Sequence, residues 1–479
     1  MRAKIADRAA PPRLALVGEE APGRDLVRFG VAVLVGAVFS AVQVFVIPRR
    51  LDLATYGQYR LFLVYVAYVE LLNFGIADGA FLRWAGRRPA AIAREWRTVG
   101  KWLLAVQLFI LIAAAIAAQV VPSALLRAYV IAFATCALCV NASVLSSYAL
   151  QAAGDFKRAG RVVILAPACF AVGMLTLPIH TLHAALGMYV SAFAVAATYA
   201  AFAVSRLGAV ADVDGDARDA PAVGALIHSG SHVLGANVAA GLSRSTDRIL
   251  VSVFTPITSF ALYGFASTVM VAATVATQAL SRVALSHAAR RTQEDRARFL
   301  SGFFDLIAAA YGIGLIAEPL FEHLVHRYLP NYVSALWIVR ALTFGLPISV
   351  ATHVVLVGTL QSYGLVRRQL AVELCGVALV AVSCGLALWR DLPLWMVAGS
   401  ATVASAATLA VGVAIVRRTV SDAVSIASVR FLVLIAVQSA ALLVAYRSSD
   451  SWVLQSAIYV VLAFAPTWWV AARARVQGW

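Results

Sequence analysis

Residues 151–160 read "QAAGDFKRAG", and residues 361–370 read "QSYGLVRRQL". Both stretches fit the pattern Gln-x-x-Gly-x-x-(Lys/Arg)-Arg, and each stands between two long apolar segments. The same polar corner therefore recurs at a spacing of 210 residues. Its recurrence in the same kind of place indicates that one structural unit is written twice in the chain.

The composition places these segments in a membrane. Of the 479 residues, 62% are hydrophobic and 13% are charged, and the mean hydropathy is +0.85. A soluble globular domain is about 45–50% apolar and about 25% charged. A water-soluble core cannot hold that much apolar surface, so the sequence predicts an all-α polytopic membrane protein.

The net charge of +16 would favour nucleic acid as a partner of a soluble protein. Here the basic residues lie mostly in short loops between apolar segments, where they set the orientation in the membrane. No nucleic-acid partner is expected. The distribution predicts that the N- and C-termini are both cytoplasmic, and the first helix is expected to be retained rather than cleaved.

A transmembrane helix needs about 20 mostly apolar residues. The sequence predicts about fourteen such helices, and the short loops between them leave no room for a sizeable domain on either face. They are expected near 29–47, 58–82, 101–121, 124–150, 162–180, 182–205, 226–254, 262–284, 300–321, 333–360, 371–389, 394–416, 429–446 and 452–471.

A second repeated motif supports the duplication. Tyr56-Gly57 follows the first helix and Tyr263-Gly264 follows the seventh, a spacing of 207 residues that nearly equals that of the two corners. Because six helices separate the copies, both halves start on the same side, and two parallel six-helix repeats around a central cleft are expected. The predicted parts are a cytoplasmic tail (1–28), the first repeat (29–205), a cytoplasmic linker (206–225), the second repeat (226–416) and two additional helices with the C-terminus (417–479).

Charge within the bilayer is costly, so the exceptions are informative. The densest exception is "GLSRSTDRILVSVF" (241–254) in the seventh helix, where Arg244 and Arg248 are one turn apart and Asp247 stands between them. Asn237 falls on the same side. We expect this stripe to line a cavity in which the two arginines contact an anion. The alternative is an Arg–Asp pair near the outer interface with snorkelling arginines.

Other polar residues occupy apolar segments of the first and second helices. Glu70 stands in the middle of the second helix with Asn73 on its face, and it is either an ion-coupling site or a structural hydrogen-bond partner. Ser40 and Gln43 in the first helix are candidate polar residues of the cavity, or else belong to a helix-packing surface.

Three further charged residues are expected to be peripheral. Glu318 and Glu322 bracket a proline near an outer end and are interpreted as interfacial. Arg340, near the outer end of the tenth helix, is expected to snorkel toward the interface.

The motifs of several other functions are missing. The sequence has no G-x-x-x-x-G-K-[ST], so no ATP site is expected. Cys136 and Cys139 form a C-x-x-C inside an apolar segment without a second ligand pair, and are expected to be packed side chains rather than a metal site. No recognised hydrolase constellation occurs. We expect neither catalytic residues nor a metal or other cofactor, and the protein is not expected to be an enzyme.

Together these features resemble the bacterial polysaccharide-unit (oligosaccharidyl-lipid) flippases of the multidrug/oligosaccharidyl-lipid/polysaccharide exporter superfamily. The resemblance is carried by residues 46–86 and 245–267, with Tyr-Gly after the first helix and Asp247-Arg248 ahead of a second Tyr-Gly. It implies a flippase that moves an undecaprenyl-pyrophosphate-linked sugar across the inner membrane by alternating access, with membrane lipids, a polysaccharide polymerase and chain-length proteins as expected partners. Arg244 and Arg248 would contact the pyrophosphate.

The resemblance leaves alternatives. A lipid-linked peptidoglycan-precursor flippase of the superfamily would carry charged cavity residues in the first helix, where this chain has only Ser40 and Gln43. A cation-coupled drug antiporter would need a cation site, for which Glu70 is the candidate. A membrane polymerase or glycosyltransferase would need carboxylates in an outer loop, and only Asp52 lies in the first one. The sugar unit, the coupling ion and the oligomeric state stay open.

Overall fold

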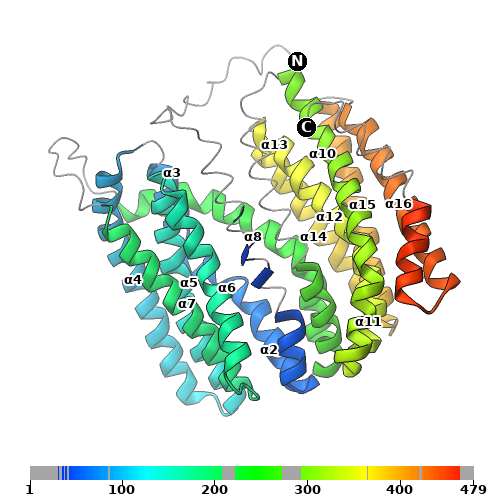
Figure 1. Ribbon diagram of the computed structural model, residues 1–479. Coiled ribbons are helices and arrows are strands. Elements are labelled where there is room, and N and C mark those ends of the chain that lie inside the picture. The colour runs from blue at the N-terminus through cyan, green and yellow to red at the C-terminus, as the bar shows by residue number, and fades with distance from the viewer. Residues whose placement is uncertain are drawn as a thin grey trace. The chain divides into compact units, whose positions relative to one another are not determined.

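The structure is a computed structural model. It describes residues 43–84, 87–207, 222–271, 293–363, 365–419 and 423–463, with a few positions between 31 and 39. The regular elements over these ranges are helices (Figure 1). Each of the fourteen predicted segments contains helical residues. Within the described ranges, nine helices are long and apolar enough to span a membrane, and a broken pair would make ten. The expected all-α polytopic fold is confirmed.

The chain folds into two compact units. Unit one comprises 1–32, 69–166 and 193–234, and unit two comprises 33–68, 167–192 and 235–479. Three long helices contribute residues to both: α6 (Phe156–Thr176), α7 (Leu182–Ser205) and α8 (Val223–Phe254). These units divide the chain differently from the predicted six-helix repeats, which stay a prediction.

In unit one, α4 (Pro89–Val120) packs along α5 (Ala124–Ala152), and α3 (Ile76–Trp84) packs against α5 (Figure 1). Pro89 stands in the first turn of α4, where its missing N–H leaves no hydrogen bond unmade. In the second turn of α4, the carboxylate of Glu95 is held by Arg83, Arg87 and the Trp84 indole. This cluster ties the start of α4 to the end of α3.

The prediction of one continuous helix over 58–82 is wrong. The segment divides into α2 (Leu53–Val66), a 3₁₀ turn η2 (Val69–Asn73) and α3, and the backbone of Phe74 and Gly75 has φ of 52° and 81°. The Asn73 side-chain oxygen accepts from the Gly75 N–H at 2.8 Å, which stabilises the break locally. Gly75 is also required by packing, because its Cβ position is occupied by the backbone of Gly230.

Unit two contains most of the remaining helices. In chain order these are α2, a helix at Ile257–Val271, α10 (Gln293–Gly314), η4 (Leu315–Ala317), α11 (Glu318–Tyr328), η5 (Pro330–Ala335), α12 (Leu336–Ala351), a π-helical turn η6 (Thr352–Val357), α13 (Gly358–Ser362), α14 (Val366–Trp389), α15 (Leu394–Thr419), α16 (Ala423–Ser448) and a helix at Trp452–Ala463. α15 packs against both α12 and α14, and α10 packs against α16 (Figure 1).

The two Tyr-Gly motifs lie side by side within unit two, inside helices rather than in loops. The phenol rings of Tyr56 and Tyr263 are fully buried. A Cβ on Gly57 would collide with the main-chain oxygen of Ile257, and a Cβ on Gly264 would lie 3.2 Å from the Arg60 side chain. Each glycine thus faces the helix that carries the other, a reciprocal contact expected of two related segments.

The two polar corners have the same pattern of backbone hydrogen bonds. Ala153 N–H donates to the Ala149 carbonyl at 3.0 Å and Asp155 N–H donates to the Leu150 carbonyl at 2.9 Å. At the second corner, Tyr363 N–H donates to Thr359 and Leu365 N–H donates to Leu360, at 3.2 and 2.8 Å. The four residues of the second corner follow those of the first at the same 210-residue spacing.

The last two helices are bonded to α10 by buried polar groups. Asp305, 1% exposed, receives a two-pronged ion pair from Arg430 on α16. The Gln438 amide donates to the Ala308 carbonyl at 3.2 Å, and the Tyr459 hydroxyl donates to Gly312 at 2.8 Å. These helices therefore share the core of unit two instead of lying loosely beside it.

Candidate functional site

The seventh apolar segment folds as predicted into the long helix α8, which ends at Phe254. Arg244 stands ten residues before that end, about 15 Å along the helix axis. With 32 residues, α8 is long enough to span a bilayer, yet its polar and charged residues keep it from being one of the nine clearly apolar spans. Such a helix is stable at bilayer depth only where its polar face is buried in protein or lines a water-filled cavity.

The polar face of α8 borders a cavity of about 260 Å³ within unit two. Two arginines and an aspartate of α8 line one side, and small or apolar side chains of the helix Ile257–Val271, α12, α14 and α15 line the rest. The lining residues are Ser243, Arg244, Asp247, Arg248, Ser267, Met270, Val271, Leu342, Gly345, Leu346, Ser349, Val380, Ala401, Thr402 and Ser405. We call this the cationic cavity.

Arg248 is positioned by its own helix. Its Nη2 donates to the Arg244 carbonyl at 2.6 Å, and its Nε lies 3.9 Å from the Asp247 carboxylate. Asp247 in turn accepts from the Tyr263 hydroxyl at 2.7 Å. The tyrosine of the second Tyr-Gly motif thus orients the acid that holds Arg248, a role that the sequence alone did not suggest.

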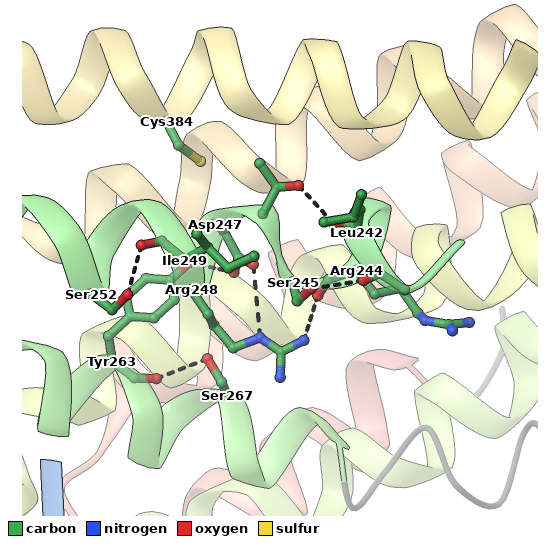
Figure 2. Close-up of polar contacts among 12 residues, drawn as sticks. Leu242, Arg244, Ser245, Asp247, Arg248, Ile249, Ser252, Tyr263, Ser267 and Cys384 are labelled. Atoms are coloured by element: carbon green, nitrogen blue, oxygen red, sulfur yellow. Dashed lines mark hydrogen bonds and ion pairs between the residues drawn. The ribbon is translucent and has the colours of Figure 1, made fainter. Parts of the chain in front are cut away.

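Arg244 points elsewhere. In Figure 2 its guanidinium extends away from the one of Arg248, although both side chains line the cavity. Its acidic neighbour is Glu373 on α14. The carboxylate of Glu373 is 2% exposed and lies 3.3 Å from Nδ1 of His353, in the π-helical turn. Arg244 therefore belongs to a second polar cluster on the cavity rim.

Glu373 was not predicted as a site residue; it is the third residue of the apolar run "AVELCGVALV" (371–380). Its signal was the same as for the α8 arginines, a charge within a predicted span. The π-helical turn that brings His353 to Glu373 leaves no clear mark in the sequence.

The other predicted site residues are not lining residues of the cationic cavity. Asn237 is an exposed residue of α8, and Gln43 is half-buried, while Ser40 lies outside the described residues. In unit one, Asn73 is 1% exposed and donates to Asn141 at 3.4 Å. Glu70, in η2 of unit one, has an exposed side chain.

The expectation that Glu318 and Glu322 are interfacial is wrong. Both are 8% exposed, and both lie within the span Gly302–Tyr328. Glu322 accepts from Arg340 through both carboxylate oxygens, at 2.5 and 2.6 Å. Arg340 is also held between the rings of Trp337 and Tyr446, at 4.7 and 4.2 Å, so it does not snorkel as predicted.

The charged residues that line the cationic cavity are two arginines and one aspartate. Arg248 is only loosely paired with Asp247, and an arginine fork binds phosphate oxygens two at a time. Over the described residues, no group of three or more His, Cys, Asp or Glu side chains could hold a metal ion.

Comparison with known proteins places the fold. No family model matches the sequence, and no curated protein matches it. Among solved structures, the lipid II flippase MurJ in an inward closed conformation is 12% identical, covering 92% of this chain and 98% of that chain with a TM-score of 0.67. A MATE structure in complex with MaL6 is 14% identical, covering 86% and 97% with a TM-score of 0.60.

A third structure, a transporter from Pyrococcus furiosus Vc1 whose binding pocket is described as reversed in polarity, is 13% identical. It covers 84% of this chain and 96% of that chain with a TM-score of 0.60. These neighbours are transporters and flippases, not enzymes. At such identities the likeness concerns the fold alone, and this chain is a multi-pass membrane protein with the fold of the MOP superfamily transporters.

Proposed function

We propose that this protein is a flippase that moves an undecaprenyl-pyrophosphate-linked oligosaccharide from the cytoplasmic to the periplasmic leaflet of the bacterial inner membrane, for the synthesis of a surface polysaccharide. Its N- and C-termini are cytoplasmic in this proposal. A polysaccharide polymerase and chain-length proteins would consume the product outside. The observation that carries the proposal is the cationic cavity, in which Arg244 and Arg248 lie deep in a membrane helix.

The chemistry of such a cargo matches the cavity. A lipid-linked sugar has a pyrophosphate and many hydroxyls, and each unpaired polar group costs several kcal/mol in hydrocarbon. A wet cavity with two arginines removes that barrier for the headgroup, while the lipid tail stays in the bilayer. Arg248, whose Nε lies 3.9 Å from its only acidic contact among the described salt bridges, is the first contact for the pyrophosphate.

The membrane potential supplies a driving force. A pyrophosphate carries about two negative charges, and moving them from the negative interior gains about 2.3 kcal/mol per charge per 100 mV. The arginines stay behind, so the cargo crosses with its own charge. A coupled cation is then needed mainly to reset the empty, positively charged cavity.

A lipid-linked peptidoglycan precursor is the second candidate cargo, because one structural neighbour is a lipid II flippase with a similar fold over 92% of this chain. Its headgroup would also present a phosphate anion to Arg248. The lack of charged residues in the predicted first helix favours the polysaccharide unit. Transport of each cargo by the same preparation separates the two.

The test is flipping of fluorescent lipid-linked sugars in proteoliposomes, with each cargo class assayed separately. We expect wild type to flip the undecaprenyl-pyrophosphate-linked oligosaccharide, and an inside-negative potential to speed its exit. R244A and R248A should abolish flipping, and the lysine variants should restore it in part, since Lys keeps the charge and loses the fork.

The matched control is R390A, which removes an exposed arginine at the end of α14, beside Trp389. It should flip cargo as wild type does. Full activity of both alanine variants in the cavity would refute the proposed role of the arginines. Flipping of the peptidoglycan precursor alone would assign the protein to the second cargo.

A further inference from the structure

A second cavity, of about 420 Å³, lies within unit two. Its walls come from α10, α11, α12 and the helix Ile257–Val271, and they are apolar almost throughout, with Leu306, Phe321 and Val339 among them. One carboxylate, that of Glu318, stands in this apolar wall. We call this the acidic cavity.

Glu318 is a buried acid whose oxygens are not satisfied. It is 8% exposed, and neither carboxylate oxygen has a hydrogen-bond partner among the described residues. An ionised carboxylate in that setting is strongly unfavourable, and a group so placed takes up a neutralising partner. Its neighbour Glu322 is the internal contrast, because both of its oxygens accept from Arg340.

Among the residues that the structure describes, the charges around Glu318 leave one negative charge unbalanced. The described charged groups facing it are Glu322 on its own helix and Arg340 on α12. The titratable groups are three phenols, of Tyr311 on α10, Tyr446 on α16 and Tyr459. Arg340 is already committed to Glu322, and the Tyr311 and Tyr459 hydroxyls bond to Ser439 and to the Gly312 carbonyl.

The lining of the acidic cavity fits a proton better than a metal ion. Hard cations such as Ca²⁺ take about six to eight oxygen ligands. Here a single carboxylate is accompanied by the Thr343 and Tyr311 hydroxyls in an otherwise hydrocarbon wall. A protonated carboxylic acid needs no such shell, and its neutral form suits the apolar surface.

The acidic cavity adjoins the cationic cavity. Met270 and Leu346 line both, and the Thr343 hydroxyl, on the acidic side, lies 4.0 Å from the Met270 sulfur. Met270 and Leu346 thus form a wall that the two cavities share, and a change of charge at Glu318 acts on the cationic cavity across it. Glu70, the acid that the sequence favoured for coupling, has an exposed side chain in η2 of unit one.

We propose that Glu318 is the proton-binding site of the transport cycle. A proton taken up from the periplasm converts its carboxylate to the carboxylic acid, and its release to the cytoplasm returns the carboxylate. The protonation state of Glu318 and the cargo in the cationic cavity influence each other through the wall formed by Met270 and Leu346. The coupling to cargo, though not the protonation itself, rests on the function proposed above.

The test is infrared difference spectroscopy of the full-length protein in lipid nanodiscs, stepped between acidic and alkaline buffers without cargo. Wild type should show the C=O stretch of a buried carboxylic acid that appears on acidification. The band should be absent in E318Q and unchanged in E70Q, the matched control. Because glutamine has the shape of a protonated glutamate, we expect E318Q to accumulate in the membrane normally.

Several results would overturn the assignment. They are a band that persists in E318Q, a band that Na⁺ removes from wild type at constant pH, and a band that tetraphenylphosphonium removes, which would make the cavity a lipophilic-cation site. If E318Q does not accumulate, E318D replaces it, and a band that does not move in E318D refutes the proposal equally.

A transport measurement separates this proposal from the proposed function. In proteoliposomes with an internal pH dye, cargo export should move protons inward in wild type, and E318Q should flip cargo without proton movement. Spectra that fail while flipping persists refute the proton site alone. Spectra that succeed while neither cargo class is flipped refute the proposed function alone.

Discussion

The two adjoining cavities of unit two are built on opposite principles. The cationic cavity is lined by two arginines and one carboxylate, that of Asp247, and the Nε of Arg248 lies 3.9 Å from that carboxylate, so the guanidinium keeps donors for a ligand. Beside the acidic cavity, Arg340 has complete partners, since it is paired with Glu322 and lies against the rings of Trp337 and Tyr446. There the surplus charge is the acid, Glu318.

The difference teaches how to separate functional from structural charges in a membrane protein. A charge with complete partners, such as Arg340 or the buried pair of Asp305 and Arg430, joins helices. A charge with incomplete partners that borders a cavity needs a ligand, a proton or water. By this criterion we propose that Arg248 and Glu318 are functional and that Arg340 is structural.

Replacing Arg340 should break the comparison most severely. R340A leaves Glu322 beside Glu318 without a cation, and removing one partner of a buried ion pair costs about 3–5 kcal/mol. We expect a large drop in thermal stability of the purified protein, and a much smaller one for R248A. In a double-mutant cycle, E322Q should rescue most of the loss. Equal stabilities of R340A and R248A would remove the distinction between the two arginines.

Filling the shared wall should affect both cavities together. L346W adds bulk to a residue that lines both, and overpacking costs about 1–3 kcal/mol. We expect slower flipping and a shifted infrared band of Glu318 in the same variant. V253W, at an exposed position near the end of α8, is the control and should change neither. An effect on flipping without any change at Glu318 would show that the cavities are uncoupled.

Loosening the Asp247 support should have the smallest effect. Y263F removes the hydroxyl that donates to Asp247 at 2.7 Å, and a hydrogen bond contributes about 0.5–1.5 kcal/mol net. We expect cargo affinity to fall by about two- to tenfold, measured by titration of purified protein. Y68F serves as a second tyrosine variant, because the Tyr68 hydroxyl also contacts α8, at Ser245. Affinity unchanged in Y263F would show that Asp247 does not need the phenol to position Arg248.

The sequence could predict the membrane helices and the arginine stripe because both depend on local patterns. Apolar runs reveal spans, and a one-turn spacing puts Arg244 and Arg248 on one helix side. It could not predict that their guanidinium groups diverge, or that Glu373 faces Arg244, since those are tertiary contacts. Glu318 was misplaced because a nearby proline suggested a helix end, whereas the chain stays helical through η4 into α11.

The break after Asn73 was also hidden from periodicity. An apolar run looks the same whether it forms one helix or two, and only the positive φ of Phe74 and Gly75 divides it. The tight approach of Gly230 explains why a glycine stands there. The sequence showed the two Tyr-Gly motifs only as a repeat. That they contact each other is a tertiary feature, which only the fold reveals.

The most direct test of the central claim is binding of undecaprenyl pyrophosphate, the charged part of the cargo without its sugar, to the purified protein in nanodiscs. We predict saturable binding to wild type and to R390A, a loss of affinity of at least about tenfold in R248A, and little binding to the R244A/R248A double variant. Inorganic pyrophosphate should compete. Equal affinity of wild type and the double variant would contradict the claim that the cationic cavity receives the anion.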